Sequence, residues 1–203
     1  MHLINQRALG ILIVVLLIAL IVIKRVATGS VLEKPKGSVL LWLVNIFNLF
    51  FLLIANPISA ILLINEKMDG FDPSFLVIRN GNLLAVIEIC GLIIYLFGII
   101  LMSWALIILG RNYQLGGADP RASDTLVTNG PYQFIQHPMY TGALCIALGL
   151  ACLIQSILCL AVFCMYIVLI ILMLPSEEES LVRAYGDSYR QYKQKVRKLF
   201  PFY

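Results

Sequence analysis

The chain has 203 residues, of which 61% are hydrophobic and 13% are charged, and its mean hydropathy is +0.92. Soluble domains carry about 25% charged residues, so this composition excludes an ordinary soluble protein and indicates an integral membrane protein. The net charge of +4 does not indicate a nucleic-acid partner, because the basic residues are divided between loops and the C-terminal segment instead of forming one face.

The five cysteines all lie within apolar stretches and form no CxxC pair. This pattern is typical of small buried hydrophobic side chains, and it predicts neither a disulfide framework nor a zinc site. No other metal site is expected, since His137 with the nearby glutamates would offer one histidine and no soft ligand.

The first apolar stretch covers residues 8–23. Because Arg7 precedes it, it has the form of a secretory signal core. However, Lys24 and Arg25 follow directly, without a small-residue cleavage site, which favours a retained membrane span.

Two further spans follow. Residues 38–64 exceed the ~20 residues needed to cross a bilayer, and Asn56-Pro57 is expected to kink the helix. Residues 83–109 form the third span and contain Glu88. A carboxylate within a span is a functional hypothesis by default, and a hydrogen-bonded structural role is the alternative.

Residues 139–174 carry no formal charge and are too long for one crossing, so they predict two spans folded as a hairpin near Gln155-Ser156. Pro175 is expected to end the last span. Residues 177–198 then have apolar side chains at helical spacing, which predicts an amphipathic helix on the membrane surface.

We therefore expect an all-α integral membrane protein with about five transmembrane helices, the last two a helical hairpin, and a C-terminal amphipathic interfacial helix. Residues 1–203 would form a single membrane domain, with three N-terminal spans in 1–109 and a polar loop, the hairpin and the C-terminal helix in 110–203. The first loop, the third loop and the C-terminal segment hold 12 of the 15 Lys and Arg residues, which predicts a cytoplasmic C-terminus.

The stretch GPYQFIQHPMYTG, residues 130–142, places His137 just before a proline that suits the first turn of a helix. The predicted topology brings further polar side chains to the same rim: Asp124, Thr125, Tyr132, Tyr140, Glu177, Glu178 and Glu179. A helix N-terminus favours an anion, and carboxylates accept from hydroxyls or an ammonium. Together with aromatic rings for an adenine, these groups suit a zwitterionic nucleoside cofactor such as S-adenosylmethionine. Alternatively, His137 only caps a helix and the glutamates are solvated.

Two motifs resemble the isoprenylcysteine carboxyl methyltransferase family and its relatives among phospholipid methyltransferases. DTLVTNGPYQFIQHPMYTG is similar to that family's Leu-Val pair, Gly-Pro-Tyr, Arg-His-Pro-x-Tyr and Gly. SEEESLVRAYGDSYRQYKQKVRKLFPF is similar to its closing Glu-Glu pair, Gly-x-x-Tyr-x-x-Tyr and terminal proline. Their order and their separation by a hairpin-length apolar stretch make the joint pattern specific over about 80 residues.

The resemblance implies that S-adenosyl-L-methionine is the cofactor, with S-adenosyl-L-homocysteine as its product, and that residues 110–203 form the catalytic region. It places the cofactor contacts at Gln114, Asp124, Thr125, Leu126, Val127, Tyr132, His137, Pro138, Met139, Tyr140, Glu177 and Glu178. Gln114 matches only across a gap. His137, Tyr140 and Glu177 would orient the reactants, and no residue is singled out for the chemical step.

Two positions depart from the family pattern. Gln136 replaces the arginine that precedes His-Pro, and Met173 stands where the carboxyl methyltransferase has an arginine implicated in substrate handling. The second departure matters more, because a cation there would neutralise a carboxylate acceptor.

The implied reaction is transfer of a methyl group to an acceptor embedded in the lipid bilayer. Carboxyl methylation of a C-terminal isoprenylcysteine, or of a similar lipidated carboxylate, is the first expectation, and N-methylation of an amino-headgroup phospholipid is the alternative. A non-catalytic membrane binding protein with the same fold is a further alternative. A transporter is disfavoured, because no repeated half is visible in the sequence.

Overall fold

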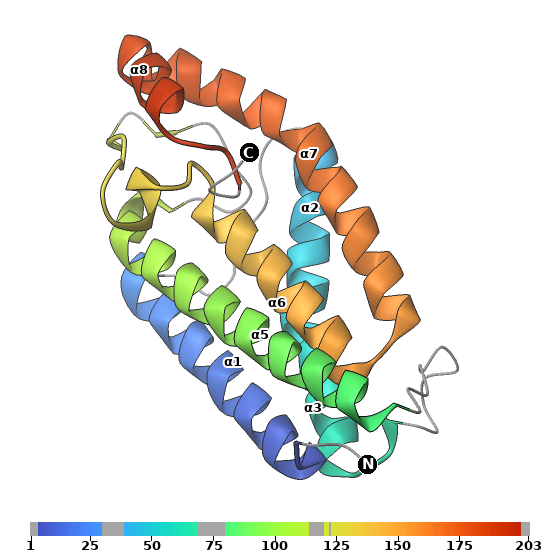
Figure 1. The fold of residues 1–203 in the computed structure, drawn as a ribbon. Coiled ribbons are helices and arrows are strands. Elements are labelled where there is room, and N and C mark those ends of the chain that lie inside the picture. Colours follow the sequence, from blue (N-terminus) through green and yellow to red (C-terminus); the bar gives the residue numbers. More distant parts are fainter. Residues whose placement is uncertain (1–3, 30–38, 69–79, 114–119, 122, 200–203) are drawn as a thin grey trace.

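The computed structural model describes residues 4–29, 39–68, 80–113, 120–121 and 123–199. In these residues the protein is helical (Figure 1), and a β-bridge joins Ile135 to Arg197. The elements are α1 (Gln6–Thr28), α2 (Val39–Phe50), η1 (Phe51–Ala55), α3 (Asn56–Ile64), α5 (Gly81–Leu109), η2 (Gly110–Asn112), η3 (Gly130–Gln133), α6 (Pro138–Ile154), α7 (Ile157–Tyr185) and α8 (Asp187–Lys195).

Four helical segments within the described residues are long and apolar enough to cross a membrane: Gln6–Thr28, Val39–Ile64, Gly81–Asn112 and Ile157–Tyr185. The remaining expected span is α6, which has 17 residues and lies at the short end of the ~17–25 that a crossing requires. Large apolar side chains such as Ile93, Phe97 and Ile100 are exposed along α5. Such faces suit contact with lipid, and the predicted all-helical membrane fold is confirmed.

The second span is irregular at the predicted place. A π-helical turn, η1, occupies the five residues before Asn56-Pro57, and the Asn56 side-chain amide donates to the Phe51 carbonyl at 2.8 Å. The Tyr95 hydroxyl on α5 donates to Asn56 Oδ1 at 2.9 Å. The Asn56 backbone N–H donates to the same Phe51 carbonyl. Asn56 therefore binds the irregular turn through its backbone and its side chain and joins this span to α5, so its polar side chain is paired within the bundle.

The Glu88 carboxylate contacts hydrogen-bond donors from two other parts of the chain. Its side chain is buried, and its carboxylate accepts from the Ile4 backbone N–H at 3.2 Å and from Gln155 Nε2 at 3.4 Å. These contacts connect the start of α1 to the turn between α6 and α7. They support the hydrogen-bonded structural alternative for this carboxylate.

The hairpin turn lies where the sequence predicts it. Gln155 ends α6 in the left-handed conformation, with φ of 54°, and the Ser156 hydroxyl caps α7 by accepting from the Cys159 N–H at 3.1 Å. The prediction that Pro175 ends the last span is wrong, because α7 continues through it to Tyr185. A proline costs one intrahelical hydrogen bond, which neighbouring elements of a membrane bundle can offset.

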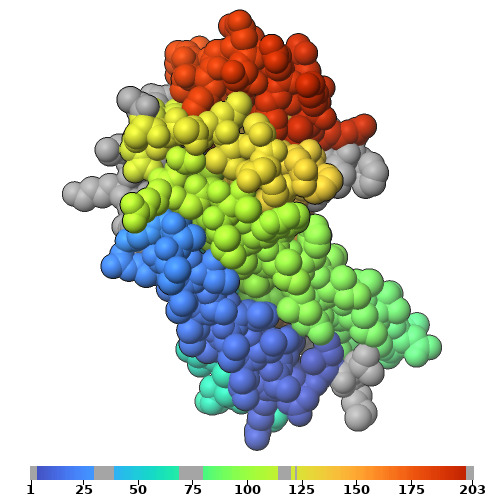
Figure 2. Space-filling model, turned by 90° about the vertical axis from the view of Figure 1, so that its left-hand side faces the viewer, coloured from blue at the N-terminus to red at the C-terminus, as the bar shows by residue number. Residues whose placement is uncertain are grey.

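The amphipathic helix is also shorter than predicted. It begins after Gly186, whose φ of 57° separates α7 from α8, and covers Asp187–Lys195 rather than residues 177–198. Two of its apolar side chains, Tyr189 and Tyr192, are buried. Figure 2 shows the C-terminal segment in red lying against the yellow segment that precedes α6, at one end of the molecule.

Helices α5 and α6 approach so closely that glycines are required between them. A Cβ atom added at Gly149 would lie 2.6 Å from the backbone nitrogen of Tyr95, and one added at Gly98 would lie 2.7 Å from the carbonyl oxygen of Gly142. Small residues at such contacts let membrane helices pack backbone to backbone. This contact fixes α6 against α5.

Gly149→Ala is expected to destabilise the protein by about 1–3 kcal/mol, because the added methyl group overlaps backbone atoms that cannot move alone. The thermal midpoint in detergent measures this effect. Gly81→Ala is the matched control, because no atom lies within 4 Å of its added Cβ. Equal midpoints for the two variants would contradict the close α5–α6 contact.

Candidate functional site

A cavity of about 260 Å³ lies where α1, α5 and α7 approach their C-terminal ends and α6 begins. Ten of the predicted cofactor contacts line it: Asp124, Thr125, Leu126, Val127, Tyr132, His137, Pro138, Met139, Tyr140 and Glu177. Gln114 lies outside the described residues. Glu178 is not among the lining residues, and its carboxylate instead contacts Lys198 Nζ at 2.8 Å and Lys193 Nζ at 3.7 Å.

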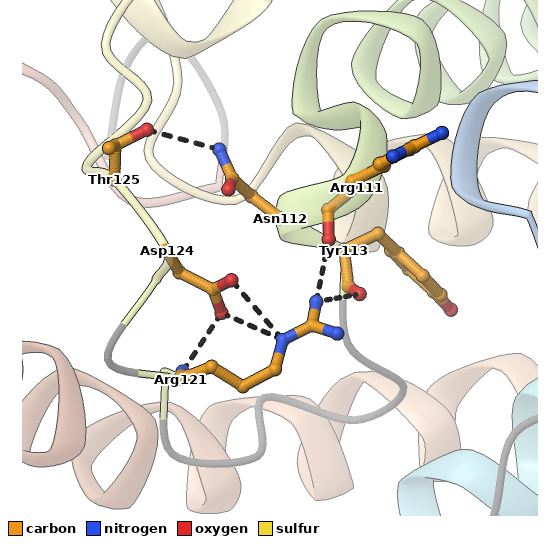
Figure 3. Close-up of polar contacts among 6 residues, drawn as sticks. All are labelled: Arg111, Asn112, Tyr113, Arg121, Asp124 and Thr125. Carbon is orange, nitrogen blue, oxygen red and sulfur yellow. Dashed lines mark hydrogen bonds and ion pairs between the residues drawn. The ribbon is translucent and has the colours of Figure 1, made fainter.

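The loop before α6 is held together by Arg121 (Figure 3). Its guanidinium donates to the carbonyl oxygens of Arg111 at 2.6 Å and Tyr113 at 3.3 Å, and its Nε lies 3.2 Å from Asp124 Oδ1. Asn112 Nδ2 donates to Thr125 Oγ1 at 3.3 Å. The two limbs of the loop are thereby joined, which places Asp124 and Thr125 on the cavity wall.

The predicted start of α6 is confirmed. Pro138 occupies the first helical position and His137 precedes it as the N-cap residue. Helix geometry leaves the N–H groups of Met139 and Tyr140 without intrahelical acceptors, and both residues line the cavity. The cavity wall therefore includes a helix N-terminus, the feature that favours an anionic group.

The C-terminal segment returns to the start of α6 and pairs with it. The N–H of Gln136 donates to the Arg197 carbonyl at 2.7 Å, and the N–H of His137 donates to the Lys198 carbonyl at 3.0 Å. The Gln136 side-chain amide donates to the carbonyls of Lys193, at 3.2 Å, and Val196. The residue that replaces the family's arginine thus binds the C-terminal backbone without adding charge.

Four buried polar atoms have no hydrogen-bond partner within the described part of the chain and belong to residues that line the cavity. They are Gln136 Oε1, His137 Nε2, Glu177 Oε2 and Tyr189 Oη. Buried polar groups are normally paired, and an unpaired one costs about 1–3 kcal/mol. A ligand with both donors and acceptors would satisfy them, so the site fits a polar cofactor.

Burial determines the protonation state of the His137 side chain. Burial lowers the pKa of the His137 imidazole below its usual value of 6.5, although the carboxylates of Glu177 and Glu178 act in the opposite direction. The distance from His137 Nδ1 to Glu177 Oε1 is 3.9 Å. His137 is therefore neutral at pH 7, and the negative charge of the Glu177 carboxylate remains available to a cationic ligand group.

The cavity continues from this polar rim into an apolar section. Its deeper wall includes Leu49, Leu52, Met102 and Ile146 from the spans, with few polar side chains among them. Tyr166 is one of these, and its hydroxyl donates to Asn48 Oδ1. A polar rim that opens into an apolar channel can hold a hydrophilic cofactor and a lipid chain together.

The Met173 side chain does not line the cavity. Its side chain is fully buried in a cluster with Leu144 and Ile170, and Tyr140 Oη lies 4.0 Å from its Sδ. The position at which the family resemblance implies an arginine is therefore a core position here. The lining residues that the sequence does not predict include Lys24, Asn48 and Tyr166, because spacing along the chain does not show which helices meet.

Several known proteins are similar to this chain in sequence or in fold. The sequence profile of the phospholipid methyltransferase family matches residues 86–188. The protein-S-isoprenylcysteine O-methyltransferase of Xenopus laevis is 33% identical over 118 residues, which are 57% of this chain and 41% of that protein. The phosphatidylethanolamine N-methyltransferase B of Dictyostelium discoideum is 42% identical over 64 residues, 31% of this chain and 32% of that protein.

The aligned stretches thus span less than half of the length of these two curated relatives. A solved structure, that of the eukaryotic intramembrane Ras methyltransferase ICMT, has a TM-score of 0.55 to this protein at 20% identity. That likeness covers 80% of this chain and 74% of the other, and it shows a shared fold. The resemblance expected from the two motifs is confirmed, and the chain belongs to the phospholipid methyltransferase family.

Proposed function

We propose that the protein transfers a methyl group from S-adenosyl-L-methionine to an acceptor in the membrane, releasing S-adenosyl-L-homocysteine. The observation that carries this proposal is the junction of two environments in one cavity. Unpaired buried polar atoms of Gln136, His137, Glu177 and Tyr189 lie at its rim, and apolar helix faces line its deeper part. A hydrophilic donor and a lipid acceptor would meet at this junction.

The rim residues have complementary chemistry for the cofactor. The Glu177 carboxylate would accept from its ammonium group, and the N-terminus of α6 would bind its carboxylate. The Asp124 carboxylate would accept hydrogen bonds from the ribose hydroxyls of the cofactor. The tyrosine rings would line its adenine. When bound, the cofactor supplies an activated methyl group, so the protein contributes mainly orientation and the exclusion of water.

The preferred acceptor is the carboxylate of a C-terminal isoprenylcysteine or a similar lipidated carboxylate. Support comes from the Xenopus laevis relative, whose name states this activity, and from the fold shared with ICMT. A carboxylate needs no general base, so this reaction would require the site only to hold and orient the two reactants.

N-methylation of an amino-headgroup phospholipid is a second candidate. It is favoured by the local identity to the Dictyostelium discoideum N-methyltransferase and by Met173, which supplies no cation for a carboxylate. An amine must lose a proton before it can accept a methyl group, so this reaction would require a base such as His137 or Glu177.

We also propose that the cavity faces the cytoplasm, because the ends of α1, α5 and α7, together with the segments that follow each of them in sequence, carry 12 of the 15 Lys and Arg residues. Green fluorescent protein fused after residue 203 is then expected to fluoresce in bacterial cells, and alkaline phosphatase at the same position is expected to be inactive. The reverse pair of results would place the cavity on the opposite side.

Glu177→Gln is expected to weaken binding of S-adenosylhomocysteine about tenfold to a hundredfold, because a hydrogen bond to a charged group contributes about 1.5–3 kcal/mol. Isothermal titration of the detergent-solubilised protein measures this, together with His137→Ala. Glu179→Gln is the matched control, since its exposed carboxylate pairs with Arg183 at 3.0 Å away from the cavity. Absence of binding by folded wild type, or equal affinity in all variants, would refute the cofactor assignment.

Incubation with methyl-labelled cofactor and either an S-prenylated cysteine or phosphatidylethanolamine is expected to label the first acceptor. The product bond identifies the chemistry, because base releases methanol from a methyl ester and leaves an N-methyl group intact. Labelled methanol from the prenylcysteine reaction supports carboxyl methylation. Base-stable label in the phospholipid alone would establish the second candidate in its place.

A further inference from the structure

Lys24 is the single lysine or arginine among the described residues that line the cavity. It lies near the C-terminal end of α1, and its side chain is partly buried. Its Nζ is 5.1 Å from the centroid of the Tyr113 ring, within the range of a cation–π contact. The described part of the lining therefore includes one ammonium group in addition to the carboxylates of Asp124 and Glu177.

The ring beside this ammonium is held by the loop that forms the cofactor rim. The Tyr113 carbonyl accepts from Arg121, which is fixed in turn by Asp124, and the Tyr113 side chain extends away from Arg121 (Figure 3). The turn η2, which directly precedes Tyr113, packs on α1. The position of the Lys24 ammonium is thus coupled to the loop that carries Asp124.

Lys24 also lies at the boundary between the two sections of the cavity. Leu20 and Ile21, about one turn earlier on α1, line the cavity together with Leu49 and Leu52 from the second span. A lipid chain in the apolar section would follow this face of α1. Its polar end would then reach the rim at Lys24.

We propose that Lys24 binds the carboxylate of the lipid acceptor, in the role that an arginine at position 173 would otherwise fill. This inference rests on the proposed carboxyl methylation. The cofactor's own carboxylate has a separate partner in the N-terminus of α6, whereas Met173 is enclosed in the core and can offer no charge. Among the described residues that line the cavity, Lys24 is therefore the cation suited to the acceptor carboxylate.

The charge change of the reaction decides which kinetic constant Lys24 controls. An acceptor carboxylate oxygen forms the new bond to the methyl carbon, the carbon–sulfur bond breaks with its electron pair on sulfur, and the product is a neutral ester. The attraction to Lys24 is thus strongest for the substrate and is lost in the product. An interaction of this kind lowers KM and does not raise kcat.

Steady-state kinetics with an S-prenylated cysteine at saturating cofactor test the proposal. Lys24→Met and Lys24→Gln are expected to raise the acceptor KM about tenfold, with kcat within about twofold of wild type and the affinity for S-adenosylhomocysteine unchanged. Lys24→Arg is expected to restore most of the acceptor affinity. Arg25→Met is the matched control, because the neighbouring cation does not line the cavity, and it is expected to behave as wild type.

Three results would overturn the proposal. An unchanged KM in both neutral variants would show that the acceptor does not contact Lys24, and weakened S-adenosylhomocysteine binding would assign Lys24 to the cofactor. A lower thermal midpoint together with a lower kcat, not corrected by arginine, would show a structural role. If the wild-type protein binds S-adenosylhomocysteine but esterifies no carboxylate, the proposed acceptor is wrong. The wild-type measurement alone shows this, so it is distinguished from a failure of the Lys24 proposal.

Discussion

The direct backbone contact between α5 and α6 determines where the polar rim can form. Gly98 and Gly149 allow this contact, and any larger side chain at either position would separate the two helices. Because α6 lies against α5, its first turn begins beside the loop that leaves the end of α5. The N-terminus of a short helix is thereby brought to the same level as Asp124, and the hairpin returns Glu177 to that level on α7.

The C-terminal segment completes the rim from the other side. Its backbone carbonyls accept from Gln136 and His137, and the Thr141 hydroxyl donates to the Leu199 carbonyl. These contacts involve residues on either side of the α6 start, so the C-terminal segment holds this start in place next to the cavity.

Hydropathy and local chemistry predict the spans, the turn at Gln155 and the proline start of α6, because each depends on residues close together in sequence. The same reasoning fails where a distant segment decides the outcome. The helix α7 continues through Pro175 although proline is locally unfavourable there, and the role of Gln136 depends on a segment about 60 residues later. Lys24 joins the cavity only because α1 packs beside the end of α5. Sequence thus predicts most rim residues but not the channel below them.

Helical periodicity explains why two adjacent glutamates have different surroundings. Neighbouring residues on an α-helix point about 100° apart, so one cavity cannot receive both carboxylates equally. Glu177 faces the cavity, where its Oε2 is unpaired, whereas Glu178 faces Lys193 and Lys198 of the C-terminal segment. The two acids therefore have different contacts: the Glu178 carboxylate binds the C-terminal segment, and the Glu177 carboxylate lies on the cavity wall.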